Sequence, residues 1–338
     1  MILIQNYSLA IFFTILAMIC WGSWANTQKI AAKTWRFELF YWDLIVGIAI
    51  MSLVTAFTVG SLGVQGRTFL EDLATADFSS IGFAMLGGIL WNIGNILLVA
   101  AISVAGLAIA FPIGGGIAWI LGIIINYILI LLSGQEASEK PVTLWIGVVI
   151  IITAIVLSGK IYDKVAKEKK QASLKGVVLS VLAGLFIAFF YGFVVKSLDA
   201  SFVAGGTGKL TPYTGIVFFT LGVIISTLII NPIIMHKPII GDPVSMKLYW
   251  KGTIREHSSG VLGGMIWMLG MTFSFMAAGA ANPAISYALS NAAPVVAILW
   301  GIFVWKEFKG APKGTNSLLL ILFICYLMGL VLITYSNA

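Results

Sequence analysis

The sequence predicts an all-α integral membrane protein, with ten transmembrane helices arranged as two five-helix inverted repeats. Of its 338 residues, 60% are hydrophobic and 10% are charged, so too little polar sequence is present to cover a soluble globule. Many apolar stretches exceed about 18 residues, the length that a helix needs to cross a bilayer. A segment that starts at Leu86 also returns at Leu262, which indicates a duplicated unit.

The ten spans follow from the apolar stretches and their polar interruptions. In chain order the predicted spans are 8–30, 39–60, 80–102, 107–132, 142–159, 175–198, 214–235, 260–280, 283–304 and 316–335. The halves 1–160 and 175–338 would each hold five spans and would be joined by a linker at 161–174. Because five is an odd number, the second half must enter the membrane upside down relative to the first. Secondary transporters share this plan and place their site near the midplane.

The repeat is clearest in the third and eighth spans. Leu86-Gly87-Gly88 is matched by Leu262-Gly263-Gly264, and Trp91 is matched by Trp267. We therefore expect Trp91 and Trp267 to border one central cavity, related by a pseudo-two-fold axis in the membrane plane.

Lys and Arg residues concentrate in the loops that follow odd-numbered spans, which favours a cytoplasmic position for those loops. Both termini would then face outside, and the linker at 160–175 would lie in the cytoplasm, next to the lipid of a bacterial inner membrane. The net charge of +7 has the same explanation, so it does not indicate nucleic-acid binding.

The chain shows no pattern typical of an enzyme, a metal site or a cofactor site. Its two histidines, His236 and His257, fall in one predicted loop, and no nucleophile has a base beside it in the sequence. Both cysteines, Cys20 and Cys325, lie inside apolar stretches. We expect no catalytic residue, no metal and no cofactor.

Polar groups at membrane depth are the candidate binding residues. Span 1 ends with Trp21, Trp24, Asn26 and Gln28. Polar side chains in hydrocarbon are costly unless they face a cavity or a protein partner, so these four residues are predicted to contact substrate. Interhelical hydrogen bonds and an interfacial tryptophan belt are the alternative interpretation.

Span 3 carries Trp91, Asn92 and Asn95. Residues three or four apart share a helix face, so this span predicts an indole wall with two amides. Such a wall suits a flat or hydroxylated polar solute that needs both stacking and hydrogen bonds. In the second copy Trp267 is kept while methionines replace the amides, which makes span 3 the predicted specificity element.

Spans 4, 6 and 9 add Phe111, Tyr191, Tyr287 and Asn291 to the predicted substrate-binding residues. Phe111 precedes Pro112 and a run of glycines, which predicts a bend and close packing in span 4. Structural packing alone is the alternative for this segment.

Asp43 and Lys196 are the candidates for proton coupling. Asp43 lies within span 2, and an acid at that depth can bind a proton on one side of the membrane and release it on the other. An ion pair with Lys29, Lys33 or Arg36 is the alternative. Lys196, near the end of span 6, would meet Asp43 or the substrate if it points inward, and would otherwise reach the interface.

Several short motifs resemble a known family. An acid closes spans 4 and 9 at Gln135-Glu136 and Lys306-Glu307, and the ten-span duplicated plan with these acids resembles the drug/metabolite transporter superfamily. Within it, the loop from Lys237 to Tyr249 resembles the Pro-rich segment of ureide permeases, and Tyr41-Trp42-Asp43 resembles their acid early in span 2. The run from Leu90 to Asn95 is more weakly similar to the rhamnose-proton symporter branch.

The ureide permease resemblance implies uptake of a small polar nitrogenous solute, such as allantoin, uracil or a purine, driven by a proton gradient. The rhamnose symporter resemblance implies a sugar instead, and export of a drug or an amino acid is a further alternative. The partners expected from the resemblance are a small-molecule substrate, a proton or another cation as coupling ion, and membrane lipid. A receptor or scaffold that transports nothing is the hypothesis from another class.

Overall fold

The computed structural model describes residues 1–31, 34–134, 136–166, 174–199 and 207–337, and most of these residues are helical. Within this described part, ten helical segments are long and apolar enough to cross a membrane. The chain is therefore an all-α integral membrane protein, which confirms the predicted all-α class and the ten predicted spans.

The membrane helices follow the predicted spans closely. Spans 1 to 5 are α1 (Tyr7–Ser23) with α2 (Ala25–Ala31), α3 (Phe37–Phe57), α5 (Phe78–Ala105), α6 (Leu107–Leu132) and α7 (Pro141–Ala166). Spans 6 to 10 are α8 (Leu174–Ser197), α9 (Pro212–His236), α11 (Ile254–Ala281), α12 (Pro283–Ser290) with α13 (Pro294–Phe303), and α14 (Thr315–Tyr335). Most of the predicted linker, residues 167–173, lies outside the described residues.

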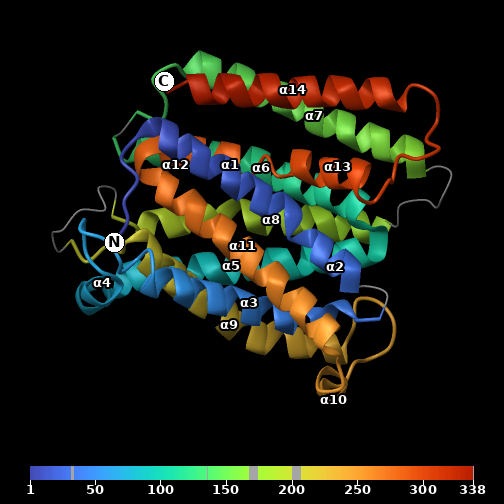
Figure 1. Cartoon of the computed structure of the whole chain (residues 1–338), viewed down its shortest axis with the longest axis horizontal. Helices are drawn as coiled ribbons and strands as arrows, with labels where there is room; N and C mark the ends of the chain where they lie inside the picture. Colours follow the sequence, from blue (N-terminus) through green and yellow to red (C-terminus); the bar gives the residue numbers. More distant parts are fainter. Residues whose placement is uncertain (32–33, 135, 167–173, 200–206, 338) are drawn as a thin grey trace.

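The helices lie side by side in one bundle, with both chain termini at the same end (Figure 1). We call this end, which also carries the short helix α4 (Phe69–Thr75), the terminal side. The other end carries α2 and the short helix α10 (Met246–Tyr249), and we call it the basic side because the predicted Lys- and Arg-rich loops connect there. Helices α7 and α14 pack against each other along one edge of the bundle.

Helix α11 differs from its predicted span because it begins six residues earlier, at Ile254 rather than 260. Thr253 and Glu256 form a capping box, in which each side chain bonds the other residue's backbone N–H and so starts the helix. His257 consequently lies in the first turns of a helix and not in a loop, which corrects the sequence interpretation.

Two spans are each divided between two helices. Span 1 breaks at Trp24, between α1 and α2, and span 9 breaks at residues 291–293, between α12 and α13. Pro294, which has no backbone N–H, opens α13. The bend that the sequence predicts in span 4 does not interrupt the helix, because α6 continues as one helix through Pro112.

Glycines allow α5 and α9 to meet backbone to backbone. A Cβ atom built on Gly88 of α5 would lie 2.0 Å from the carbonyl oxygen of Phe219, and one on Gly222 of α9 would lie 2.1 Å from that of Met85. Both distances are far too short for a real side chain, so glycine is required at each position.

Helices α3 and α11 meet in the same way. A Cβ atom on Gly264 of α11 would lie 2.0 Å from the carbonyl oxygen of Leu44, and one on Gly47 of α3 would lie 2.0 Å from that of Val261. These close contacts hold the membrane helices that surround the centre of the bundle.

Candidate functional site

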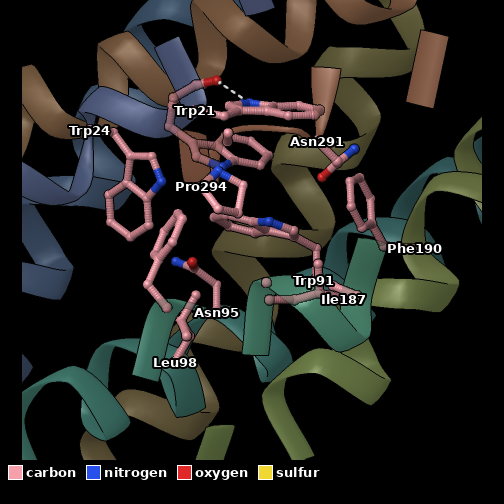
Figure 2. A pocket seen from close by; sticks show the side chains of 14 residues that line it. Trp21, Trp24, Trp91, Asn95, Leu98, Ile187, Phe190, Asn291 and Pro294 are labelled. Carbon is pink, nitrogen blue, oxygen red and sulfur yellow. Dashed lines mark hydrogen bonds between the residues drawn. The ribbon is translucent and has the colours of Figure 1, made fainter. Parts of the chain in front are cut away.

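A small cavity of about 60 Å³ lies in the middle of the bundle, next to the breaks in spans 1 and 9. Seven residues predicted to bind substrate line it: Trp21, Trp24, Trp91, Asn95, Phe111, Trp267 and Asn291. The remaining lining residues are apolar or small: Leu98, Gly115, Ala118, Ile187, Phe190, Ala293 and Pro294. The cavity is therefore aromatic, with a polar contribution from two amides (Figure 2).

Three indole rings form one wall of the cavity. The Trp267 ring lies between the other two, with its centroid 6.0 Å from that of Trp21 and 4.0 Å from that of Trp91. The Trp21 indole N–H donates to the carbonyl oxygen of Trp267 at 3.0 Å, which fixes the orientation of this ring (Figure 2). Because the rings are held by hydrogen bonding and packing, they present a rigid aromatic surface to a planar solute.

The two amides stand at different sides of the cavity, Asn95 near Leu98 and Asn291 near Phe190 (Figure 2). The Asn95 amide nitrogen donates to the Tyr41 hydroxyl at 3.4 Å, and the Asn291 amide nitrogen donates to the Tyr287 carbonyl at 3.1 Å. Neither side-chain oxygen has a hydrogen-bond partner among the described residues. The cavity thus offers two amide oxygens that can accept hydrogen bonds from a bound solute.

A larger cavity of about 590 Å³ follows one helical turn beyond, on the basic side. We call it the vestibule. Gln28, one turn after Trp24, lines the vestibule, as do Trp35 and Arg36. Lys29 forms an ion pair with Glu307 at its wall. The amide oxygen of Gln28 is buried and has no hydrogen-bond partner in the described part of the chain.

On the terminal side the cavity is closed by a layer of packed aromatic and hydroxyl side chains. The Tyr191 ring stacks on Phe275 at 4.7 Å and meets the Tyr287 ring edge-on at 4.9 Å. The Tyr191 hydroxyl lies 3.2 Å from the Ser274 hydroxyl, and the Tyr287 hydroxyl donates to the Ala118 carbonyl at 2.7 Å. Tyr191 and Tyr287, both predicted to contact substrate, are in this layer and do not line the cavity.

Asn92 also lies behind the cavity wall, where the sequence predicted a cavity residue. Its side-chain oxygen accepts from Tyr41 at 2.7 Å and from Thr227 at 3.1 Å, and its amide nitrogen donates to Ser226 at 2.9 Å. Asn92 therefore joins α3, α5 and α9, and its hydrogen-bonding capacity is used within the protein.

Asn26 is likewise directed away from the cavity. Its side-chain oxygen accepts from the Trp305 indole at 2.5 Å, and its amide nitrogen donates to the Ser23 carbonyl at 2.9 Å. Trp305 belongs to the segment that follows α13, so Asn26 joins α2 to that segment.

Asp43 is buried near the basic side and accepts three hydrogen bonds. The donors are the Trp35 indole at 2.9 Å and the Tyr249 hydroxyl at 2.7 Å, and the Nδ1 atom of His257 lies 2.8 Å away. Burial raises the pKa of the Tyr249 hydroxyl. The Asp43 carboxylate, which accepts a hydrogen bond from this hydroxyl, raises the pKa further.

The ion pairs considered for Asp43 are not formed with Lys29 or Arg36. Lys29 pairs with Glu307, and Arg36 pairs with Glu38 at 2.6 Å. Lys33 lies outside the described residues.

The structure does not bring Lys196 to the cavity or to Asp43. Lys196 is exposed near the terminal end of α8, and its ammonium group lies 4.2 Å from the centre of the Phe83 ring. A long side chain close to a helix end can reach the interface in this way, which was the alternative interpretation.

The sequence prediction missed two groups of residues. The small and apolar members of the cavity wall carry no polar signal, although the proline at position 294 marks the helix break. His257, one partner of Asp43, was missed because the region around it was assigned to a loop, whereas the spacing of Thr253 and Glu256 signals a helix start.

Comparison with protein families gives a match to the ureide permease model over residues 40–175 and 162–336. The chain belongs to the ureide permease family. It is 22% identical to Ureide permease 1 and 23% identical to Ureide permease 2, both from Arabidopsis thaliana, over 100% of this chain and 99% of each relative. It is 21% identical to Probable ureide permease A3 from Vigna unguiculata, over 93% of this chain and 99% of the relative.

These relatives are named as permeases and not as enzymes, in agreement with the absence of a catalytic pattern in the sequence. A solved structure described only as the crystal structure of a protein superposes with a TM-score of 0.58 at 16% identity, covering 98% of both chains. This similarity shows that the two chains share a fold.

Proposed function

We propose that this ureide permease family member is a secondary active transporter of a small planar ureide or nucleobase-type compound, such as allantoin, uracil or a purine. The observation that carries the proposal is the central cavity, where three indole rings stand beside the free amide oxygens of Asn95 and Asn291. Relatives matched over their whole length carry the name ureide permease.

The chemistry of the cavity supports an N–H-rich substrate. Ureides and nucleobases are flat and present amide-like N–H groups, which the oxygens of Asn95 and Asn291 could accept while an indole face stacks on the ring. A sugar presents hydroxyls that both donate and accept, and it has no planar ring. The names of the relatives do not favour a sugar or an exported drug as the substrate.

We further propose that the two halves are inverted repeats that move relative to each other around this cavity. The close glycine contacts support this arrangement because they occur in corresponding pairs. Gly88 against Phe219 corresponds to Gly264 against Leu44, with offsets of 176 between the glycines and 175 between their partners (264 − 88 and 219 − 44). In one contact the glycine comes from the first half and its partner from the second, and in the other contact these roles are reversed. A pseudo-two-fold axis in the membrane plane is expected to produce such a pair of contacts.

Proton-driven uptake into the cytoplasm completes the proposal. The distribution of Lys and Arg supports a cytoplasmic position for the basic side, so the vestibule would open inward and the tyrosine layer would close the outer side. Asp43 is the proposed proton-binding acid. A bacterial inner membrane stays a prediction, as the named relatives come from plants.

Ligand stabilisation of the purified protein would test the substrate class. We expect allantoin, uracil or a purine to raise the unfolding temperature, since a ligand at 100 times its Kd adds about 2.7 kcal/mol to stability. Counterflow of the same labelled compound in proteoliposomes would then show transport. Stabilisation by rhamnose or glucose, with none by any ureide or nucleobase, would contradict the proposal.

A further inference from the structure

We infer that Asp43 and His257 form one proton-binding site, and that Trp35 connects the occupancy of this site to the wall of the vestibule. This inference rests on the proposed proton-coupled transport and adds residues and a mechanism to it. The Asp43 carboxylate is held by partners from three segments other than its own helix: Trp35 before α3, Tyr249 in α10 and His257 in α11.

Because Asp43 is buried, its carboxylate needs a positively charged partner, and His257 is the residue that can supply this charge. The Asp43 side chain is 1% exposed, and His257 is the only side chain able to carry a positive charge that contacts it in the described part of the chain. A buried carboxylate without a cationic partner is strongly unfavourable. The pair carries a net charge of zero when it holds one proton more than an ionised Asp43 and a neutral His257, and this is the proton-loaded state of the proposed site.

Few other ionisable groups face this pair. Tyr249 from α10 donates to Asp43, and Glu256 in the first turn of α11 interacts electrostatically with His257. Arg36 and Glu38, at the start of α3, are paired with each other. Loss of this proton would thus leave a net charge of −1 that no other described cation contacts.

The more exposed member of the pair is His257, which lies near the basic side in the first turns of α11. The side chain of His257 is 29% exposed, whereas that of Asp43 is 1% exposed. In the proposed site, His257 is the member that water can reach, and Asp43 lies behind it within the protein.

Trp35 links this site to the vestibule. Its indole donates to Asp43 and its side chain forms part of the vestibule wall. A Cβ atom at Gly252 would lie 2.5 Å from both Trp35 and His257, so the site is closely packed and has little room to adapt to a changed charge. We expect loss of the proton to leave an uncompensated buried carboxylate, to shift the neutral donors around it, and so to change the vestibule wall at Trp35.

Transport by charge-neutral variants tests the site. His257→Gln keeps a donor for Asp43 but cannot carry a proton, and Asp43→Asn removes the acid. In proteoliposomes, both variants should lose accumulation of labelled uracil or allantoin above the level seen without a proton gradient, and both should keep counterflow. His236→Gln, at the exposed end of α9, is the matched control and should accumulate like the wild type.

Hydrogen exchange gives a readout that does not need a substrate. After correction for intrinsic rates, residues 34–43 and 246–257 of the wild type should exchange faster as the pH rises, because the deprotonated site opens. His257→Gln should remove this pH dependence, and His236→Gln should keep it. If ureide transport failed but this pattern held, the proton site would stand and the substrate class would fall.

The inference is overturned if His257→Gln accumulates substrate with the wild-type pH profile, or if its exchange keeps the wild-type pH dependence. Should a single variant fold poorly, the double variant Asp43→Asn with His257→Gln replaces the charged pair by two amides and should restore folding. Gradient-driven accumulation by the folded double variant would equally contradict a proton site here.

Discussion

Two asparagines in α5, one helical turn apart, have different environments. Asn95 lines the cavity with a free amide oxygen, while Asn92 is hydrogen-bonded to Tyr41, Ser226 and Thr227. The sequence could predict that both amides avoid lipid, since polar groups at membrane depth need partners. It could not predict which one faces the cavity, because the partners of Asn92 are distant in sequence: Tyr41 lies in α3, and Ser226 and Thr227 lie in α9, more than 130 residues away.

We predict that Asn95→Ala weakens substrate binding and that Asn92→Ala weakens folding. Loss of one hydrogen bond that is desolvated on binding costs about 1 to 3 kcal/mol, or roughly 5- to 150-fold in Kd. Isothermal titration with uracil or allantoin should show this loss for Asn95→Ala only. Asn92→Ala should instead unfold at lower temperature, because Ser226 and Tyr41 lose a buried partner.

The two variants serve as each other's control, as both shorten the same side chain in the same helix. Equal affinity of Asn95→Ala and the wild type would mean that Asn95 only supports Tyr41. Weaker binding in a fully stable Asn92→Ala variant would mean that Asn92 turns toward the substrate in another conformation.

At the scale of the helices, the lengths of the spans could be read from the sequence, but the packing partners could not. Apolar length is set by the bilayer, so it is visible along the chain. The break in span 9 was not predicted, since Asn291, Ala292 and Ala293 are compatible with a continuous helix until Pro294 is considered with its surroundings. The repeated glycines were visible, whereas the carbonyl groups that they contact depend on the tertiary structure.

We predict that Gly88→Ala and Gly264→Ala destabilise the protein, while Gly82→Ala does not. A Cβ atom at Gly88 or Gly264 would lie 2.0 Å from a backbone oxygen of the neighbouring helix, and one at Gly82 would meet nothing within 4 Å. Overpacking of this kind typically costs about 1 to 3 kcal/mol. At an unobstructed helical position, alanine instead favours the helix by up to about 1 kcal/mol over glycine.

The thermal unfolding of the three variants in the same detergent would check this prediction. The expected order of unfolding temperature places Gly82→Ala at or above the wild type and the other two below it. Similar losses for Gly88→Ala and Gly264→Ala would also agree with the proposed equivalence of the two halves. An undisturbed Gly88→Ala variant would show that α5 and α9 separate easily.

At the scale of the whole molecule, the cavity has different surroundings on its two sides. Toward the terminal side it is closed by Tyr191, Phe275 and Tyr287, and toward the basic side the vestibule begins within one helical turn. The sequence predicts two similar halves, but it does not predict which side of the cavity is closed. The side that is closed depends on how side chains of the two halves pack against each other. A transporter must open this side and close the other in each cycle.

The orientation of this asymmetric bundle in the membrane is the last prediction. In a background with Cys20 and Cys325 replaced by alanine, Ser103→Cys would place a thiol in the vestibule and Glu71→Cys would place one on the exposed helix α4. A membrane-impermeant maleimide added to intact cells should label Glu71→Cys, because α4 lies on the terminal side. It should label Ser103→Cys only in inside-out vesicles, since the vestibule opens on the basic side and the Lys- and Arg-rich loops stay in the cytoplasm. The reverse labelling pattern would place the vestibule outside, and Asp43 and His257 would then exchange protons with the external medium.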